Sequence, residues 1–219
     1  MSADVSGRGI PFVVSAPSGT GKTTVCRRVV ERDRGIAFSI SHTTRPMRAG
    51  EANGRDYHFV ARDEFLRLVA QGAFVEHAEY AGNLYGTSWA ALDAPLAAGR
   101  DLLLEVDVQG ALQLRERRRE ARFIFLLPPS RAELERRLVG RGTDAPDAIA
   151  RRLAAVDTEL RAVHAFDYAV VNDDIASATD ALLTIIAAER AGDTASAQSH
   201  WGRARVVAQI APVLPISKP

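Results

Sequence analysis

The chain has 219 residues, 47% of them hydrophobic and 25% charged, which suits one domain or a compact pair with a sizeable core. Its 28 basic and 27 acidic residues leave a net charge of +1, which argues against sequence-independent binding to nucleic acid. The single cysteine, Cys26, excludes an internal disulfide framework and a cysteine-based zinc site. The N-terminus is polar and no apolar run approaches about 18 residues, so we expect a cytoplasmic protein without a signal peptide or a membrane span.

The first predicted element is a strand over residues 10–15, an apolar run that contains two adjacent valines. A turn with two glycines ends this run, and valines at helical spacing then predict a helix from residue 22 to about 34. A second strand is expected over residues 36–41. This order of strand, glycine-containing turn, helix and strand is typical of the opening of a βαβ unit.

The pattern changes between residues 42 and 97. Polar, turn-forming segments alternate there with short aromatic runs at 57–60 and 74–76. Short helices are expected over residues 62–71 and 88–98. The segment therefore predicts a small α+β insertion rather than a continuation of the βα alternation.

The βα alternation resumes after the insertion and continues to about residue 191. Strands are expected over residues 102–107, 122–127 and 168–171, and helices over 109–119, 131–139, 146–164 and 175–191. Five strands separated by helices predict an α/β fold with a parallel sheet that is covered on both faces. Residues 192–219 contain three prolines and no sustained period, which predicts a partly ordered appendage.

The turn between the first strand and the first helix fits the Walker A pattern G-x-x-x-x-G-K-[ST], except that Ala16 stands at the first glycine. Glycines in such a loop let backbone N–H groups converge on a phosphate, and the helix N-terminus adds partial positive charge. Lys22 would reach the β- and γ-phosphates, and the Thr23 hydroxyl would ligate Mg²⁺. An ordinary tight turn is the alternative. The residues expected to bind ATP here are Ala16, Pro17, Ser18, Gly19, Thr20, Gly21, Lys22, Thr23 and Thr24.

Lysine usage singles out the same loop. The chain has two lysines, Lys22 and Lys218, and the second lies in the C-terminal tail. All other basic residues are arginine, so position 22 is expected to need a compact, flexible ammonium rather than a planar guanidinium.

A second anion site is indicated in the insertion. Arg45 and Arg48 lie among hydroxyl-bearing residues, and Tyr57 follows, a set that can bind one phosphate monoester through charge-assisted bonds. Glu76 and Asp107 are carboxylates flanked by apolar residues, and acceptor-only groups suit the N–H edge of a guanine. Taken singly, each residue could be a surface charge or a rim aromatic. Their occurrence in order with the phosphate loop favours the functional interpretation.

Taken together, these motifs resemble the guanylate kinase family, in its bacterial soluble form. The similarity runs in order from about residue 10 to about residue 190. It is carried by residues 15–23, 41–45, 50–57, 82–87, 107–110, 140–142 and 171–174.

The resemblance implies a P-loop NTPase core with an inserted α+β region that binds the nucleoside monophosphate and a helical lid. The core would consist of residues 1–41, 98–139 and 166–191, the GMP-binding insertion of 42–97, the lid of 140–165 and the C-terminal tail of 192–219.

The resemblance also implies roles for individual residues. Those at the GMP phosphate would be Ser41, Arg45, Arg48, Tyr57 and Tyr85, and those reading guanine would be Glu76, Thr87 and Asp107. Asn172 would lie at the adenine end of ATP. The catalytic set would be Lys22, Arg45, Arg137, Arg141 and Arg152, the last three closing on the ATP phosphates. Asp107 is left open between guanine reading and help as a general base.

Two positions depart from the family pattern. The family commonly has Arg-x-Pro-Arg, whereas this chain has Arg45-Pro46-Met47-Arg48, which moves the proline by one but keeps the arginine spacing. Glu105 stands where aspartate is more usual near Mg²⁺.

The implied reaction is the ATP- and Mg²⁺-dependent phosphorylation of GMP and dGMP, with a place in purine nucleotide metabolism and GMP recycling. Neither a nucleic-acid nor a membrane partner is expected, and a homo-oligomer is left open. One alternative is an enzyme like ribose bisphosphate phosphokinase, which has no guanine to read. Another is a non-catalytic guanylate-kinase-like binding module, a class that typically lacks a working phosphate loop.

Overall fold

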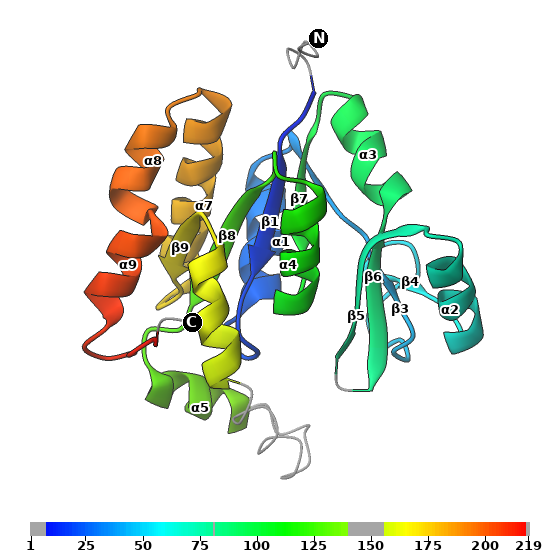
Figure 1. Cartoon of the computed structure of the whole chain (residues 1–219), viewed down its shortest axis with the longest axis horizontal. Coiled ribbons are helices and arrows are strands. Elements are labelled where there is room, and N and C mark those ends of the chain that lie inside the picture. Colours follow the sequence, from blue (N-terminus) through cyan, green and yellow to red (C-terminus); the bar gives the residue numbers. More distant parts are fainter. Residues whose placement is uncertain (1–7, 81, 140–155, 218–219) are drawn as a thin grey trace.

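The computed structural model describes residues 8–80, 82–139 and 156–217 (Figure 1). Strands in these residues form a sheet of five strands and a sheet of four. The five-stranded core sheet consists of β1 (Pro11–Ser15), β2 (Ile36–Phe38), β7 (Asp101–Glu105), β8 (Arg122–Leu127) and β9 (Tyr168–Val171). The four-stranded sheet consists of β3 (His42–Thr43), β4 (His58–Phe59), β5 (Phe74–Tyr80) and β6 (Asn83–Ser88).

The helices surround the core sheet and flank the smaller one. They are α1 (Lys22–Arg32), α2 (Arg62–Ala70), α3 (Trp89–Ala97), α4 (Val108–Arg117), α5 (Arg131–Val139), α7 (Ile175–Arg190), α8 (Thr194–Trp201) and α9 (Arg203–Ile210), with the 3-10 helix η1 (Ala162–Ala165). Residues 156–161 are also helical and are called the 156–161 helix below.

The core sheet has the order β2-β7-β1-β8-β9, and all four neighbouring pairs are parallel. This arrangement confirms the predicted α/β fold with a five-stranded parallel sheet. The strand β2 ends at Phe38, before the expected end at residue 41, because the chain then leaves the core sheet. His42 pairs with Gly86 in the smaller sheet instead.

Side chains of the core strands alternate between two hydrophobic clusters, one on each face of the sheet. In β1, for example, Val13 belongs to one cluster, and Phe12 and Val14 belong to the other. One face is covered by α3, α4, α5, α9 and residues 156–165, and the other by α1, α7 and α8. Helices therefore cover both faces, which is what a parallel sheet requires.

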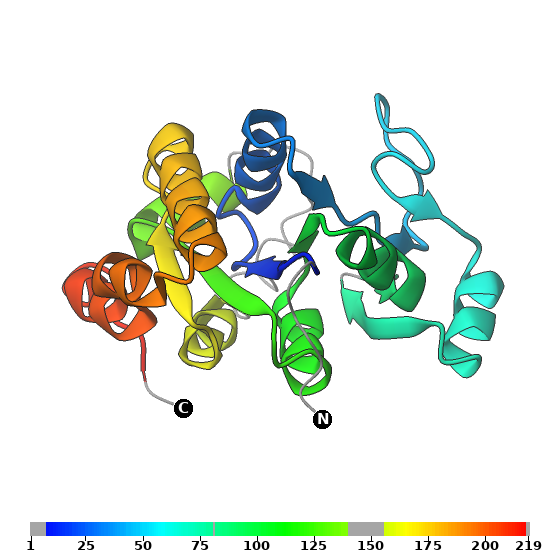
Figure 2. The same cartoon turned by 90° about the horizontal axis from the view of Figure 1, so that it is seen from above.

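The smaller sheet lies at one end of the molecule, with α2 packed on it (Figures 1 and 2). Its order is β4-β3-β6-β5, in which β3 pairs parallel with β4 and antiparallel with β6. The hairpin of β5 and β6 has an irregular register between Phe74 and Glu76, so side chains 74–76 are all buried. The bulge thereby turns Glu76 to the inside of the molecule.

The tail departs from the expectation of a partly ordered appendage, because it forms α8 and α9 at the end of the molecule opposite the smaller sheet (Figure 2). Asp193 caps α8 by accepting the Ser196 N–H at 3.2 Å. Val206, Ile210 and Leu214 are buried in the same cluster as the core strands. Each helix has only eight residues, so packing onto the core, rather than intrinsic helix propensity, stabilises the tail.

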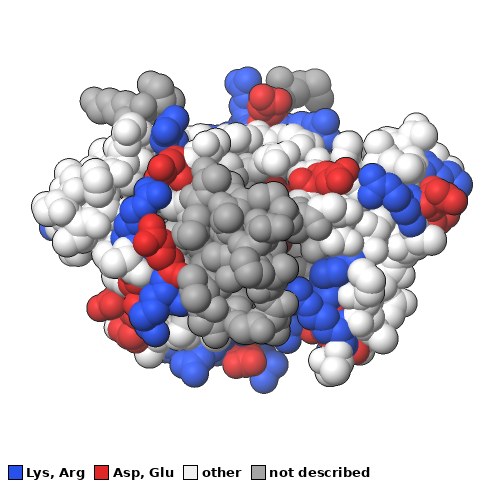
Figure 3. Space-filling view, turned by 90° about the horizontal axis from the view of Figure 1, so that it is seen from below, with Lys and Arg blue, Asp and Glu red and all other residues white. Residues whose placement is uncertain are grey.

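The surface shows both signs of charge. On the face drawn in Figure 3, basic and acidic side chains lie intermixed around the part that is not described, in keeping with the near-zero net charge. Among the described helices, none has the length and apolar character needed to cross a lipid bilayer.

Candidate functional site

The phosphate loop follows the carboxyl end of β1 and leads into α1. Gly19 and Gly21 adopt φ angles of 86° and 90°, a left-handed conformation that other residues rarely adopt. A Cβ atom on Gly21 would also lie 2.8 Å from the Asn172 Nδ2 atom. Both glycines of the Gly19-Thr20-Gly21 turn are thus required by the backbone, which supports a loop whose N–H groups point inwards.

Lys22 and Thr23, the first residues of α1, face the end of β7. The Lys22 ammonium donates to the Val106 carbonyl at 2.8 Å and lies 3.5 Å from Glu105 Oε1. The Thr23 hydroxyl donates to the same Glu105 oxygen. Lys22 is held by a carbonyl and a carboxylate at close range, a pairing that suits a compact ammonium.

Asn172, which directly follows β9, is hydrogen-bonded to the phosphate loop. Its side chain is fully buried, and Nδ2 donates to the Thr20 carbonyl at 2.6 Å. This position differs from the adenine-end role that the resemblance implies. That role stays a prediction, whereas the contact with Thr20 is a structural one.

The guanine-reading candidates converge where β5, β6 and α4 meet. Thr87 Oγ1 donates to Glu76 Oε1 at 2.6 Å and lies 3.2 Å from Ser41 Oγ. Because a hydroxyl has one hydrogen, Ser41 must be the donor to Thr87. The result is a directed chain from Ser41 through Thr87 to the Glu76 carboxylate.

Glu76 is the buried carboxyl of this group, with 4% of its surface exposed. Burial raises the pKa of Glu76 to about 7, with a further increase from the charge of Asp107 and an opposing effect from the Thr87 hydrogen bonds. Gly110 makes room for it, since a Cβ there would lie 2.4 Å from Glu76 Oε2. Asp107 caps α4, because its Oδ1 accepts the Gly110 N–H at 2.7 Å. This cap uses one of the two carboxylate oxygens, and the other is the candidate acceptor for guanine.

The phosphate-binding candidates lie in or next to strands of the smaller sheet, with Arg45 just after β3, Tyr57 just before β4 and Tyr85 in β6. Arg45 packs its guanidinium over the Tyr57 ring, 5.5 Å from the centroid, and pairs with Glu51 at 2.7 Å. Burial raises the pKa of Tyr57, so its phenol remains a hydrogen-bond donor at neutral pH. Tyr85 lies edge-on to Tyr57, with ring centroids 6.1 Å apart. Arg48 is exposed, and its backbone N–H donates to Glu51 at 2.8 Å.

One pocket lies between the phosphate-loop region and the insertion. It is lined from the phosphate-loop side by Thr23 and Glu105 and from the insertion side by Ser41 and Tyr57. Its other lining residues are Arg27, Phe38, Ser39 and Asp56. The predicted ATP side and the predicted GMP side therefore open into the same space.

An ion pair closes one wall of this pocket. Arg27 of α1 donates to Asp56 of the insertion, and Asp56 also accepts the Ala52 N–H at 2.9 Å. These bonds and the Arg55 guanidinium lower the pKa of Asp56 to about 2, so it stays ionised at any physiological pH. The pair fixes the insertion loop against the core helix.

The predicted arginines of the lid region fall in different places. Arg137 lies in α5 and pairs with Glu133 at 2.6 Å, and its other nitrogens donate to the carbonyls of Asn172 and Asp173 at 3.1 and 3.3 Å. Arg141 and Arg152 lie outside the described residues. A role for these three side chains on the ATP phosphates stays a prediction.

The pocket offers a place for a hard divalent cation. The Thr23 hydroxyl, the Glu105 carboxylate and the Ser39 hydroxyl all line it, and Ser39 Oγ is buried without a hydrogen-bond partner among the described residues. Mg²⁺ prefers oxygen ligands and is usually held by few protein groups together with substrate phosphates. No cluster of three or more His, Cys, Asp or Glu side chains suited to a metal occurs in the described residues. The donors present fit a metal that arrives with the nucleotide.

Sequence reasoning missed four residues that shape the site. Ser39, Arg27 and Asp56 line the pocket, and Gly110 accommodates Glu76. Asp56 and Gly110 stand inside motifs that carry the resemblance, so a signal for them was present. Arg27 and Ser39 carry none, because one is a helix-surface arginine among many and the other a serine at a strand end.

Comparisons with known proteins identify a family for this chain. The guanylate kinase family profile matches residues 8–189. A guanylate kinase from Dechloromonas aromatica is 53% identical over 177 residues, which cover 81% of this chain and 88% of that protein. One from Neisseria meningitidis is 51% identical over 183 residues, covering 84% and 89%. A crystal structure of guanylate kinase from Anaplasma phagocytophilum superimposes with a TM-score of 0.70 at 38% identity, covering 84% of this chain and 87% of that one.

Proposed function

The chain belongs to the guanylate kinase family, and from this premise we propose that its shared pocket transfers the γ-phosphoryl group of ATP to the phosphate of GMP. The observation that carries the proposal is the pocket itself, in which Thr23 and Glu105 face Ser41 and Tyr57. A phosphoryl donor and acceptor held side by side in one site react as if they were within one molecule, which is a large part of what catalysis of this step requires.

ATP would bind with its phosphates on the loop that precedes α1. The N–H groups of the Gly19-to-Gly21 turn and the N-terminus of α1 supply fixed positive dipoles for the phosphates. Lys22, now donating to Val106, would turn its ammonium to the β- and γ-phosphates. Mg²⁺ bound with ATP would neutralise charge on the phosphates, and Thr23 and Glu105 are the residues that would hold it.

GMP would bind with its phosphate at Arg45, Arg48 and the Tyr57 phenol. Arg45 is already oriented by Glu51 and by the Tyr57 ring, so little conformational freedom is lost on binding. A phosphate oxygen of GMP would attack the γ-phosphorus in line, with ADP as the leaving group and no covalent intermediate on the protein. Arg137 and the two arginines outside the described residues would add charge to the transferring group.

Guanine would be selected by the ionised Glu76 carboxylate. Guanine presents N–H donors at N1 and at the exocyclic N2, whereas adenine presents an acceptor at N1. A carboxylate is an acceptor-only group, so it pairs with guanine and leaves adenine with two facing acceptors. Thr87 and Asp107 complete the edge-reading group, and the directed bond from Thr87 keeps Glu76 in place.

Neither alternative fits as well. A ribose bisphosphate acceptor has no base, so it would offer no N–H donors to the buried Glu76 carboxylate, whose hydrogen bonds named above come from Thr87. A binding module would have no use for a phosphate loop in which Lys22 and Thr23 converge on Glu105.

Phosphorylation of dGMP, a cytoplasmic location and assembly into a homo-oligomer stay predictions.

The test is ADP formation from Mg·ATP with GMP, dGMP, AMP, UMP, CMP and ribose bisphosphate offered in parallel. We expect strong turnover with GMP and dGMP, and its loss in Glu76→Ala. Turnover with ribose bisphosphate alone would contradict the acceptor, and ATP binding without turnover on any acceptor would favour the binding module.

A further inference from the structure

The 156–161 helix is connected to the phosphate loop by a side-chain hydrogen bond. Glu159, on the 156–161 helix, accepts the Ser18 N–H through Oε2 at 3.1 Å. The two residues are 141 positions apart in the chain, so this bond connects the loop to a separate element. Ser18 lies in the phosphate-binding turn, where the direction of each peptide N–H decides what the loop can bind.

The 156–161 helix is in turn held by the C-terminal extension. Leu160 is buried in the cluster that contains Ile210 and Leu214, and Ile216 packs against the same cluster. Arg203, at the start of α9, donates to the His164 carbonyl in η1, directly after the helix. The extension therefore shares a hydrophobic cluster with the 156–161 helix and is hydrogen-bonded to η1, which follows that helix.

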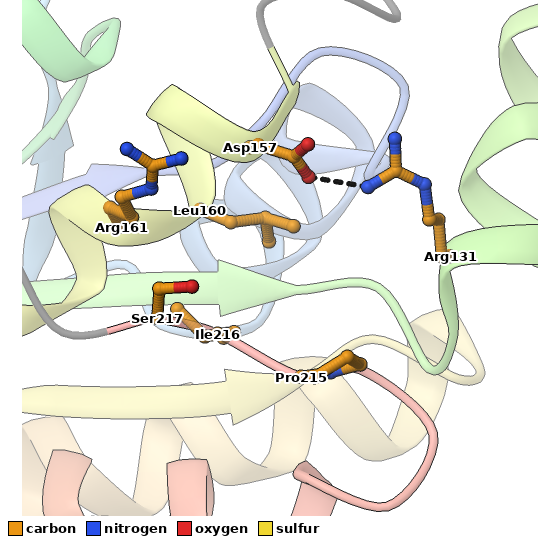
Figure 4. A pocket seen from close by; sticks show the side chains of 7 residues that line it. All are labelled: Arg131, Asp157, Leu160, Arg161, Pro215, Ile216 and Ser217. Carbon is orange, nitrogen blue, oxygen red and sulfur yellow. Dashed lines mark hydrogen bonds and ion pairs between the residues drawn. The ribbon is translucent and has the colours of Figure 1, made fainter.

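A close view shows the same arrangement. Pro215, Ile216 and Ser217 line one side of a pocket whose other side is formed by Leu160 and Arg161 of the helix (Figure 4). Asp157 pairs with Arg131 of α5 across the end of this pocket (Figure 4). These tail residues lie beyond residue 189, where the match to the family profile ends.

We propose that Glu159 is a positioning residue for the phosphate loop and that the C-terminal extension acts through it by fixing the 156–161 helix. The carboxylate sets the orientation of the Ser18 peptide, so the neighbouring N–H groups stay free to face ATP. The guanine-reading group, by contrast, lies on β5, β6 and the start of α4. The proposal rests on the proposed kinase activity and predicts an effect on ATP alone.

The first experiment compares Glu159→Ala, Glu159→Gln and Asp157→Ala with the parent chain, measuring KM for ATP, KM for GMP and kcat. Loss of one charge-assisted hydrogen bond should raise the KM for ATP in Glu159→Ala by roughly three- to tenfold. Glu159→Gln keeps an oxygen that accepts the Ser18 N–H and should recover most of this loss. Asp157→Ala removes the same charge from the same helix and breaks only a half-exposed ion pair with Arg131, which stabilises the helix little, so its KM for ATP should stay within about twofold. The KM for GMP should not change in any variant.

The second experiment removes residues 211–219 and combines this deletion with Glu159→Ala. The deletion alone should also raise the KM for ATP, and the combined effect should be smaller than the product of the two, since both act through one bond. Leu214→Ala, a milder change, gives the same test if the deletion does not fold, as judged by circular dichroism.

Several results would overturn the proposal. It fails if Glu159→Ala binds ATP as the parent does or more tightly, or if Asp157→Ala raises the KM for ATP equally. It also fails if the effects of the deletion and of Glu159→Ala multiply fully. Direct titration with ATP separates this failure from that of the kinase assignment, because a chain without GMP-dependent turnover still has a measurable affinity for ATP.

Discussion

Glu76 should make the affinity for GMP depend on pH below neutrality. The carboxyl has a pKa of about 7 in the structure, against an ordinary value near 4.5, because it is buried beside Asp107. Guanine N–H groups require the ionised form, so protonation of Glu76 competes with GMP. Lowering the pH from 8 to 6 should therefore raise the KM for GMP about tenfold, the factor expected for one pH unit below the pKa.

The same shift has a consequence for stability whose sign can be worked out. A carboxyl with a raised pKa in the folded state stabilises the fold below its unfolded pKa, and this contribution is lost as the pH rises from about 4.5 to about 7. The difference between the folded and unfolded pKa values of Glu76 corresponds to about 3 kcal/mol at pH 8. Glu76→Gln stays neutral and can still accept from Thr87, so the substitution should stabilise the nucleotide-free protein at pH 8 by up to about that amount.

The assays are a pH series of KM for GMP and urea unfolding of both proteins at pH 5 and pH 8. The phosphate of GMP titrates near pH 6 in its own right. Glu76→Gln, whose residual GMP affinity can be followed by direct binding, retains that titration and serves as the control. The reasoning is refuted if the affinity of the parent for GMP has the same pH profile as that of the variant. It is also refuted if the variant is no more stable than the parent at pH 8.

Three further substitutions test other parts of the site. Gly110→Ala places a Cβ 2.4 Å from Glu76 Oε2 and should raise the KM for GMP at least tenfold while leaving ATP affinity unchanged, which separate titrations of the two nucleotides would check. Asp56→Asn weakens the pair with Arg27, so chemical denaturation at neutral pH should show a loss of about 1–3 kcal/mol, and the loss should disappear as the pH falls towards 2, where Asp56 itself becomes protonated. Lys22→Arg should lower kcat by at least about a hundredfold despite the retained charge, because the planar guanidinium does not fit this half-buried position, and a rate near that of the parent would contradict the need for an ammonium.

The sequence was most informative where chemistry is local. The phosphate loop is a continuous run of residues, and the backbone angles at Gly19 and Gly21 are those that its glycines predict. The core sheet followed from five apolar runs for a similar reason, since strands buried on both faces are hydrophobic throughout. A local pattern needs no knowledge of the rest of the chain.

The sequence was least informative where a bulge or packing decides the outcome. Taken singly, Glu76 could have faced outwards, and only the register shift after Phe74 explains why it is buried. In the tail, Val206, Ile210 and Leu214 follow one another at intervals of four, which is helical spacing. The prolines around Leu214 and the shortness of the segment hid this pattern, and the core that stabilises it is formed by distant strands.

At both the buried carboxylate and the phosphate loop, a feature that is unfavourable for the stability of the empty protein favours binding of a nucleotide. Glu76 destabilises the empty fold above neutral pH, yet its burial is what makes a bond to guanine strong and an unpaired base costly. Gly19 and Gly21 contribute no side chains to packing, yet the backbone at these positions can approach a phosphate closely. In both places, neighbouring residues hold a locally unfavourable arrangement. Thr87 and Gly110 do so around the carboxylate, and Asn172 and Glu159 do so around the loop. The parts of this fold that look least favourable in isolation are therefore those that we expect to contact the nucleotides.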